Sequence, residues 1–372
     1  MHIGIDASRA AYRHRTGTEN YSLHLSRALL ELDSAIGAGN EFTLYFSQEP
    51  APGLFPARAR CRQRVLRFPR LWTHVRLSAE MALHRPDVLF VPAHVLPLVH
   101  PRRSVVTIHD LGYIHYPRAH RLLDRFYLRV STRWNARHAA HVLVDSGATK
   151  RDVVALLRVD PARVTVVYPG LSPNFAPASG GTIAAVRQRY SLESEYVLYV
   201  GTVHPRKNLL RLVRAFSRLQ RQGVIAERLV IAGKRGWLEG EILQAVREAG
   251  GHVTVTGFVP EEDLPALMSG ARLFAIPSLF EGFGLPALEA MACGAPVLAA
   301  YGSSLPEVVG EAGVLVDPRS EDDIADGMAR VLTNEALRQE LRLRGLQQAT
   351  RFTWEEAAQK TLAVLEEVGE MR

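Results

Sequence analysis

The stretch RLFAIPSLFEGFGLPALEAMACGAPVLAA, residues 272–300, decides the fold of the second half of this chain. RLFAIP at its start is mostly apolar and predicts a buried strand, and APVLAA at its end predicts another. Between them, Pro286 is typical of the first position of a helix, and Gly294 is typical of a helix C-cap. A strand, a helix and a second strand in so short a span indicate a βαβ unit of a parallel sheet.

Outward from this unit, strand patterns alternate with helical patterns along almost the whole chain. Apolar residues recur at helical spacing at about 18–33, 208–222 and 261–269. This alternation predicts an α/β protein with two doubly wound, Rossmann-like domains. The predicted strands are HIGIDA, EFTLYFS, DVLFVP, SVVTIH, HVLVD and RVTVV in the first half, and YVLYVG, RLVIAG, HVTVTG, RLFAIP, APVLAA and GVLVD in the second.

A segment rich in turn-forming residues, PGLSPNFAPASGG at 169–181, separates the two runs of strands and predicts an interdomain connection. We therefore expect one domain at residues 1–172 and the other at 173–352. The last residues, about 353–372, predict a helix with Thr353 as its N-cap and Glu356 three residues later. This helix is a candidate to pack back on the first domain, although periodicity alone does not place it.

The composition of the 372 residues, 47% hydrophobic and 22% charged, fits two globular cores and excludes a disordered chain. No run of about 18 uncharged apolar residues predicts a transmembrane helix, and the first residues show a strand pattern instead of a signal peptide. Cys61 and Cys293 lie far apart and predict neither a disulfide framework nor a metal centre. We expect a cytoplasmic protein, either free or peripheral at the inner face of the membrane.

The net charge of +7 is distributed unevenly. Before residue 175 the chain has 24 Lys and Arg against 13 Asp and Glu, a net charge of +11, and the remainder has 21 against 25, a net charge of −4. A basic stretch from Arg58 to Arg76 suits contact with an acidic membrane or a lipid-linked acceptor, and a solvated basic face is the alternative. It contains Arg58, Arg60, Arg62, Arg64, Arg67, Arg70 and Arg76, interleaved with Leu66, Phe68, Leu71 and Trp72.

Two carboxylates lie near the start of the predicted helix within 272–300. Because ligands of doubly wound sheets bind beyond the carboxyl ends of strands, the loop before this helix is a candidate binding site. Glu281 lies in that loop beside Gly282 and Gly284, whose amides can approach an anion at a helix N-terminus. Glu289 lies in the first turns of the helix. The alternative is that Glu281 is a solvated loop charge and that Glu289 only compensates the helix dipole.

A second candidate site follows the strand YVLYVG, which ends at Gly201. Arg206 and Lys207 open the next predicted helix, where two cations oppose the helix dipole. A diphosphate ligand would give this placement a purpose. A pair of solvated surface cations is the alternative.

Two weaker candidates lie in the first half of the chain. His109 directly follows the strand SVVTIH, where an imidazole can donate to a substrate oxygen or a leaving phosphate. The chain has 14 histidines, so a structural histidine is the alternative. Gly17 and Thr18 lie at a transition from loop to helix, where a ligand can approach the backbone, and an N-cap at Thr18 explains them equally well.

Together these motifs resemble the group 1 family of retaining glycosyltransferases, which have the GT-B fold, over nearly the whole chain. In that family two acidic residues separated by seven others form the donor signature, and Glu281 and Glu289 match this spacing. The basic pair Arg206 and Lys207 lies upstream, as in the family. The resemblance implies two Rossmann-like domains that face each other across a cleft.

The resemblance also implies roles for single residues. Arg206 and Lys207 would bind the donor diphosphate and neutralise the charge that develops as it departs. Glu281 would accept hydrogen bonds from hydroxyls of the transferred sugar, and Glu289 from the ribose hydroxyls. The amides of Phe283, Gly284 and Leu285 would hold the phosphates and the sugar.

The other implied roles are distributed over both domains. His109 would contact the sugar near its anomeric carbon, and Gly17 with Thr18 would face the diphosphate. Phe258 and Val259 would lie near the base, and Gly201 and Thr202 near the donor. Many members have two glycines where this chain has Gly17 and Thr18, and many have an arginine where it has Thr202.

The resemblance implies a retaining hexosyltransferase that needs no cofactor and no metal, since helix dipoles and cations manage the diphosphate. The segments GTVHPRKN and FTWEEAA resemble those of bacterial mannosyltransferases of the family and suggest GDP-mannose as the donor. The acceptor would be a glycan, a lipid-linked glycan or a small molecule. Alternatives are another GT-B enzyme such as an epimerase or a phosphorylase, a catalytically inactive sugar-nucleotide sensor, or a basic nucleic-acid-binding protein, although no recognition motif for nucleic acid accompanies the charge.

Overall fold

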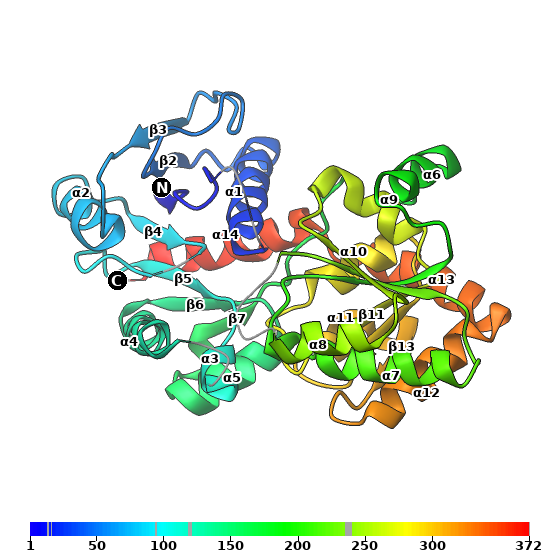
Figure 1. The fold of residues 1–372 in the computed structure, drawn as a ribbon. Coiled ribbons are helices and arrows are strands. Elements are labelled where there is room, and N and C mark those ends of the chain that lie inside the picture. Colours follow the sequence, from blue (N-terminus) through cyan, green and yellow to red (C-terminus); the bar gives the residue numbers. More distant parts are fainter. Residues whose placement is uncertain (13–14, 16, 94, 118–120, 235–239, 372) are drawn as a thin grey trace. The chain divides into compact units, whose positions relative to one another are not determined.

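The computed structural model describes residues 1–372 apart from 13, 14, 16, 94, 118–120, 235–239 and 372. The chain forms two compact units. Unit 1 contains Met1–Gly170 and Phe352–Arg372, and unit 2 contains Leu171–Arg351. Each unit has a parallel sheet flanked by helices (Figure 1), which confirms the predicted α/β class with two doubly wound domains.

The sheet of unit 1 has seven parallel strands in the order β3-β2-β1-β4-β5-β6-β7. Its central strands are fully buried, and in a parallel sheet covered by helices such strands are apolar along their whole length. The strands are β1 (His2–Asp6), β2 (Glu41–Phe46), β3 (Cys61–Val65), β4 (Val88–Val91), β5 (Ser104–Ile108), β6 (His141–Val144) and β7 (Val164–Val166).

Strand β3, with the sequence CRQRV, was not predicted because it has no apolar pattern. It pairs with β2 at one edge of the sheet, where Arg62 and Gln63 are exposed. Charged residues are common on edge strands because they hinder pairing with other chains. The first part of the basic stretch is therefore an edge strand.

Helix α14, the last in the chain, belongs to unit 1 and packs on α1. The hydroxyl of Thr353 accepts a hydrogen bond from the amide of Glu356 at 3.1 Å, so the predicted N-cap is confirmed. The other helices surround the sheet (Figure 1). The helices of unit 1 are α1 (Gly17–Ile36), η1 (Thr73–Leu77), α2 (Ser78–Leu83), α3 (Gly112–His115), α4 (Leu122–His138), α5 (Gly147–Leu157), η3 (Pro161–Arg163) and α14 (Trp354–Glu370).

The sheet of unit 2 has six parallel strands in the order β10-β9-β8-β11-β12-β13. In both units the first strand lies between the second and the fourth, so the direction in which strands are added reverses beside it. Ligands of doubly wound sheets bind at this switch point, beyond the carboxyl ends of the strands. The strands are β8 (Tyr196–Val200), β9 (Arg228–Ala232), β10 (Val253–Gly257), β11 (Leu273–Ile276), β12 (Val297–Ala300) and β13 (Gly313–Val316).

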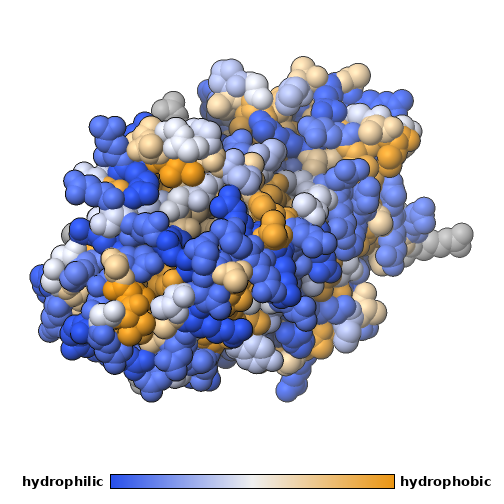
Figure 2. All heavy atoms as spheres, turned by 90° about the vertical axis from the view of Figure 1, so that its right-hand side faces the viewer, coloured by the Kyte–Doolittle hydropathy of each residue, from blue (hydrophilic) through white to orange (hydrophobic). Residues whose placement is uncertain are grey.

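Helix α6 begins inside the segment that was expected to be an irregular connection. Ser179 caps it by accepting a hydrogen bond from the amide of Thr182 at 3.2 Å, so the last two residues of 169–181 are helical. On the side of Figure 1 where α6 and α13 lie, hydrophilic residues predominate on the surface (Figure 2). The helices of unit 2 are α6 (Gly180–Arg189), η4 (Pro205–Lys207), α7 (Leu209–Arg221), α8 (Gly240–Glu248), η5 (Glu261–Asp263), α9 (Leu264–Ser269), α10 (Leu285–Ala292), α11 (Leu305–Val309), η6 (Gly310–Ala312), α12 (Glu321–Leu332) and α13 (Glu335–Ala349).

Candidate active site

Arg206 and Lys207 follow β8 in the short helix η4. Asn208, in the left-handed conformation with φ 61°, separates η4 from α7. The two cations therefore precede α7 and do not open it as predicted. The side-chain amide of Asn208 donates a hydrogen bond to the carbonyl of Pro277 at 2.9 Å. This bond ties η4 to the loop that follows β11, the neighbour of β8 in the sheet.

Glu281 lies in that loop and forms an ion pair with Lys207. The ammonium group of Lys207 donates to the two carboxylate oxygens at 2.7 and 2.8 Å. Only 6% of Glu281 is exposed, so its interpretation as a solvated loop charge was wrong. Burial alone would raise the pKa of Glu281, but the charges of Lys207 and Arg206 outweigh it and the pKa is lowered. Glu281 is therefore ionised at neutral pH.

Hydrogen bonds from neighbouring segments fix the backbone of this loop. The amide of Leu279 donates to the carbonyl of Arg206 at 2.9 Å. The hydroxyl of Ser304, after β12, donates to the carbonyls of Glu281 at 2.9 Å and Phe283 at 2.7 Å. Sequence reasoning missed Ser304, although its place just after the strand APVLAA was a usable signal. The loop is held rigidly from two sides, as a binding site requires.

Helix α10 begins directly after this loop. Its N-cap is Gly284, with φ 108°, and its first residue is Leu285, so Pro286 is the second helical residue and not the first. Cys293 is the C-cap, and Gly294, with φ 77°, follows it by one residue, so Gly294 is not the C-cap as predicted. The first amides of a helix lack intrahelical acceptors, which makes this end of α10 suitable for an anion.

Glu289 lies on α10 and is half-buried. Burial raises its pKa to about 8, and the nearby charge of Glu261 adds to the effect. A carboxylate that compensated the helix dipole would instead have a lowered pKa. Glu289 also lies beyond the first turn of α10, to which the effect of the helix dipole is confined, so its interpretation as a dipole partner was wrong. The raised pKa favours the protonated carboxyl group at neutral pH.

The remaining residues of unit 2 that we expected near the donor lie after strands. Gly201 follows β8 with φ 148°, and Thr202 after it is exposed. Val259, two residues after β10, is buried, whereas Phe258 is 55% exposed. The ammonium group of Lys234, which follows β9, lies 4.7 Å from the centre of the Phe258 ring. Lys234 is thus a further cation at this edge of the sheet, with a cation–π contact to hold it.

In unit 1, His109 follows β5 and forms a partly buried pair with Asp145, which follows the neighbouring strand β6. Nδ1 of His109 lies 2.6 Å from a carboxylate oxygen of Asp145. The ring also contacts Tyr21 edge-on, with ring centres 4.8 Å apart. Burial lowers the pKa of His109, but the Asp145 carboxylate outweighs it and the pKa is raised. Sequence reasoning missed Asp145, because nothing in the sequence shows that β5 and β6 are adjacent.

This pairing determines what the other ring nitrogen of His109 can do. Nδ1 donates its proton to Asp145, so a neutral ring would leave Nε2 as an acceptor only. The raised pKa favours the cationic form of the ring, in which Nε2 also carries a proton. Nε2 is buried and has no hydrogen-bond partner of ordinary geometry among the residues that the structure describes, although a backbone contact with Pro92 also raises the pKa of the ring. In the cationic ring Nε2 is a hydrogen-bond donor.

Gly17 and Thr18 begin helix α1, and both are exposed. Gly17 is the first helical residue, so Thr18 lies inside the helix and is not its N-cap. The hydroxyl of Thr18 donates to Glu19 at 3.3 Å. Their proposed part in diphosphate binding stays a prediction.

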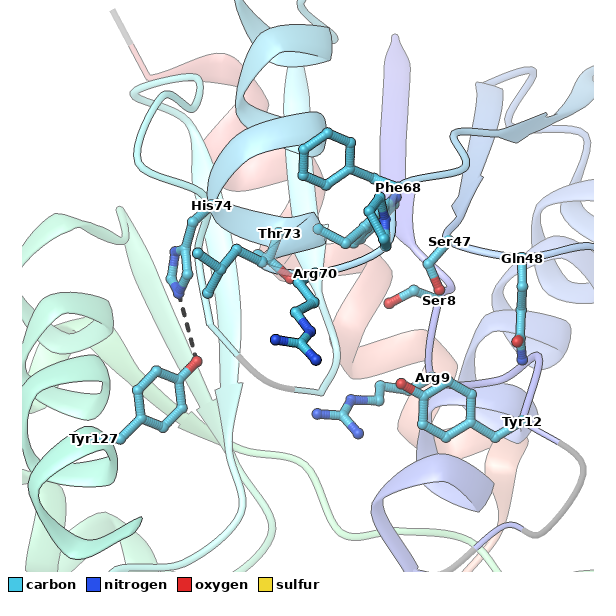
Figure 3. A pocket seen from close by; sticks show the side chains of 13 residues that line it. Ser8, Arg9, Tyr12, Ser47, Gln48, Phe68, Arg70, Thr73, His74 and Tyr127 are labelled. Atoms are coloured by element: carbon cyan, nitrogen blue, oxygen red, sulfur yellow. Dashed lines mark hydrogen bonds between the residues drawn. The ribbon is translucent and has the colours of Figure 1, made fainter. Parts of the chain in front are cut away.

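Unit 1 also contains a pocket of about 420 Å³ at the carboxyl ends of β1, β2 and β3. Figure 3 shows the guanidinium groups of Arg9 and Arg70 pointing toward the same space. Tyr127 of α4 lies on one side, where its hydroxyl is 3.5 Å from Nε2 of His74. The pocket is lined by Ser8, Arg9, Tyr12, Ser47, Gln48, Phe68, Pro69, Arg70, Leu71, Trp72, Thr73, His74 and Tyr127.

Comparison with known proteins places this arrangement in a family. Residues 185–348 match the family described as "Glycosyl transferases group 1", and residues 15–175 match "Glycosyltransferase Family 4". The O-antigen chain mannosyltransferase B of Escherichia coli is 36% identical over 264 residues, which cover 70% of this chain and 69% of that protein. The chain belongs to the group 1 family of glycosyltransferases.

Other relatives and structures agree with this assignment. The serotype-specific mannosyltransferase WbdA of Escherichia coli is 32% identical over 271 residues, but this glycosyltransferase matches only 32% of its length. The crystal structure of Anabaena HepE in complex with UDP and glucose has a TM-score of 0.73 at 19% identity, with 98% of this chain and 99% of that chain covered. The likeness shows that the glycosyltransferase has the predicted GT-B fold.

Two observations concern the part of this glycosyltransferase that the structure describes. No three His, Cys, Asp or Glu residues in that part lie close enough together to hold a metal ion. None of its helices combines the length and the apolar character needed to cross a membrane.

Proposed function

We propose that this glycosyltransferase transfers a hexose from a nucleotide-sugar donor to a glycan acceptor with retention of the anomeric configuration. GDP-mannose is the first candidate for the donor. The names of the two Escherichia coli relatives, both mannosyltransferases, support mannose as the sugar. The complex of Anabaena HepE with UDP and glucose supports a nucleotide-sugar as the class of donor.

The ion pair between Lys207 and Glu281 carries this proposal. Removing two charges from water costs several kcal/mol for each ion, which a buried pair recovers only in part, so such pairs contribute little to stability. This pair joins the ends of β8 and β11, at the switch point where ligands bind. Because the pair contributes little to stability, a role in ligand binding is the better explanation for its presence at this point of the sheet.

In the proposed mechanism the donor diphosphate lies against the cations and the N-terminus of α10. Arg206 and Lys207 neutralise the negative charge that grows on the diphosphate as the bond to the sugar breaks. Glu281, already ionised and aligned by Lys207, accepts hydrogen bonds from the sugar hydroxyls. Glu289 accepts from the ribose hydroxyls, which requires its carboxyl group to ionise. The amides of residues 283–285 complete the anion site.

His109 acts from unit 1 as a cationic donor. Its Nε2 proton would bind an oxygen near the anomeric carbon, where it stabilises the charge separation that develops during the reaction. Asp145 keeps the ring cationic and oriented. The departing phosphate takes the proton of the acceptor hydroxyl, so no carboxylate base is needed for retention. The mechanism uses no metal ion.

The pocket of unit 1 is the proposed acceptor site. A concave site with aromatic walls and a few converging polar groups is typical of pockets that bind small molecules or sugar residues. Tyr12, Trp72 and Tyr127 supply the aromatic walls, and Arg9 with Arg70 suits a glycan that carries a phosphate or a carboxylate.

The proposal is tested by incubating the protein with GDP-, UDP- and ADP-linked hexoses and measuring thermal stabilisation and release of the nucleoside diphosphate. We expect GDP-mannose to raise the melting temperature most and to be hydrolysed slowly without an acceptor. Glu281→Gln should remove the hydrolysis. No response to any nucleotide sugar, or full hydrolysis by the Glu281→Gln variant, would contradict the proposal.

A further inference from the structure

Helix α4 of unit 1 has an apolar face that is exposed to solvent, whereas the solvent-exposed face of a helix in a globular protein is normally polar. Leu122, Phe126 and Val130 are spaced four residues apart and therefore share one side of the helix. They are 74%, 69% and 53% exposed, and Leu123 beside them is 83% exposed. The opposite side of α4 packs on the unit through buried residues such as Ser131 and Asn135. Large exposed apolar residues gathered on one face mark a surface that binds something.

A row of arginines runs beside this apolar face. Arg125, Arg129 and Arg133 also follow a spacing of four residues, so they lie in a parallel row on the same helix. None of the three forms an ion pair with another residue that the structure describes. Their charge is thus available to an anionic partner. An apolar face flanked by a basic row is the pattern of a helix that lies in the surface of an anionic membrane.

The basic stretch that we expected to contact the membrane lacks this pattern. Arg64 and Arg76 both pair with Glu80, and Arg67 pairs with Glu49. Two of its four apolar residues, Leu66 and Trp72, are buried. Its remaining exposed apolar residues, Phe68 and Leu71, line the pocket proposed for the acceptor.

From these observations we infer that the outward face of α4 docks onto an anionic lipid bilayer. Leu122, Leu123, Phe126 and Val130 enter the boundary between headgroups and acyl chains, and the arginine row binds the headgroup phosphates. Tyr127, on the same helix, lines the pocket of unit 1, so docking brings that pocket to the membrane surface. This inference goes beyond the proposed function, because sugar transfer to a soluble acceptor needs no membrane contact.

The test measures binding of the full chain to vesicles by flotation. Vesicles of phosphatidylcholine alone are compared with vesicles that also contain phosphatidylglycerol, an anionic lipid. We expect binding to the anionic vesicles only. The variant Arg125→Gln/Arg129→Gln/Arg133→Gln should bind on the order of 100-fold more weakly, from the usual contribution of each basic residue near an anionic surface.

A variant of the apolar face and two control variants decide which features carry the binding. Leu122→Ser/Leu123→Ser/Phe126→Ser should lose binding, whereas Ile36→Ser/Leu83→Ser/Leu343→Ser, which changes three exposed apolar residues elsewhere, should keep it. Arg60→Gln/Arg62→Gln/Arg67→Gln, in the basic stretch, should also keep it. Unchanged melting temperatures and donor hydrolysis would show that all variants are folded.

Several results would overturn the inference. They are no binding of the natural chain to anionic vesicles, equal binding to neutral vesicles, or undiminished binding of the α4 variants. Loss of binding in the variant of the basic stretch would assign the membrane contact to that stretch instead. A dimer in light scattering that becomes a monomer in the Leu122→Ser/Leu123→Ser/Phe126→Ser variant would assign the apolar face to a second copy of the chain.

Discussion

Two buried pairs, one in each unit, are built in the same way and differ in how they respond to pH. Lys207 with Glu281 in unit 2 and His109 with Asp145 in unit 1 each join the ends of two adjacent parallel strands. The charge of Lys207 lowers the pKa of Glu281, so this carboxylate stays ionised at neutral pH. The carboxylate of Asp145 raises the pKa of His109, and histidine is the side chain that normally titrates near neutral pH. We therefore expect the contribution of the Lys207–Glu281 pair to be insensitive to pH near neutrality and the contribution of His109 to disappear at high pH.

The largest effect should come from breaking the pair in unit 2. Lys207→Ala should lower kcat on the order of 10²–10³-fold and destabilise unit 2 by about 3–5 kcal/mol, because it leaves a buried carboxylate without its partner. The double variant Lys207→Met/Glu281→Gln should regain most of the stability and none of the activity. Chemical denaturation and donor hydrolysis measure the two quantities.

A control for this prediction is Arg214→Ala, which removes an exposed ion pair with Glu321 in the same unit. It should change stability by less than about 1 kcal/mol and leave activity unchanged. If the double variant is active, or if Lys207→Ala changes stability and activity as little as the control does, the pair is structural and the donor assignment is wrong.

The second prediction concerns the pair in unit 1. Below a pH of about 6.5, the ordinary pKa of histidine, the contribution of His109 to stability and activity is fully present, and it is lost as pH rises through the raised pKa. Asp145→Asn should lower that pKa and so move the loss of activity to lower pH. Above the new pKa, the rate should fall roughly tenfold for each unit by which the pKa is lowered. The measurement is the pH profile of kcat/KM.

The matched control is Asp152→Asn, which breaks a more exposed pair with His115 at 2.7 Å. Its pH profile should coincide with that of the natural protein. A profile that is the same in Asp145→Asn and in the natural protein would show that the charge of His109 takes no part in the reaction.

A smaller effect is expected at Glu289, which forms no ion pair with any residue that the structure describes. Its pKa of about 8 in the folded chain lies above the ordinary value, so its contribution to stability is complete below about pH 4.5 and is lost as pH rises through 8. Glu289→Gln should therefore raise the melting temperature at pH 9 by about 2–4 °C, which corresponds to roughly 1 kcal/mol.

The same variant tests the proposed ribose contact. Donor affinity of the natural protein should increase as pH rises through 8, because an ionised carboxylate accepts hydrogen bonds from the ribose hydroxyls more strongly than a protonated carboxyl group does. Affinity of the Glu289→Gln variant should not depend on pH in this range. Parallel pH dependence in the two proteins would remove Glu289 from the donor site.

The last prediction compares the hydrogen bonds that support the two pairs and concerns stability alone. Ser304 donates to two loop carbonyls at 2.9 and 2.7 Å, whereas Thr149 donates to the carbonyl of His109 at 3.3 Å. Ser304→Ala should cost about 1–3 kcal/mol of stability and Thr149→Val about 0.5–1.5 kcal/mol. Thermal unfolding measures both, and the reverse order would show that the loop after β11 is not held by Ser304.

Much of the fold and part of the site could be predicted from the sequence. Alternating strand and helix patterns predicted two doubly wound domains, and the capping pattern at Thr353 predicted the start of the last helix. Glu281 and Glu289 were found because proline and glycine mark the ends of α10. Strand β3 was missed because its charged residues lie at an edge and show no apolar period. The pocket of unit 1 was missed because its walls come from segments far apart in the chain.

The sequence by itself determined which residues follow a strand, since that depends only on local apolar patterns and turn residues. Only the tertiary structure decided which of these residues meet. Lys207 and Glu281 are 74 positions apart and are neighbours because β8 pairs with β11 and not only with β9. Likewise, helical spacing predicts two faces of α4, but burial in the folded unit decides which one is left to the solvent. Strand order and burial arise from packing of the whole chain, which no local pattern encodes.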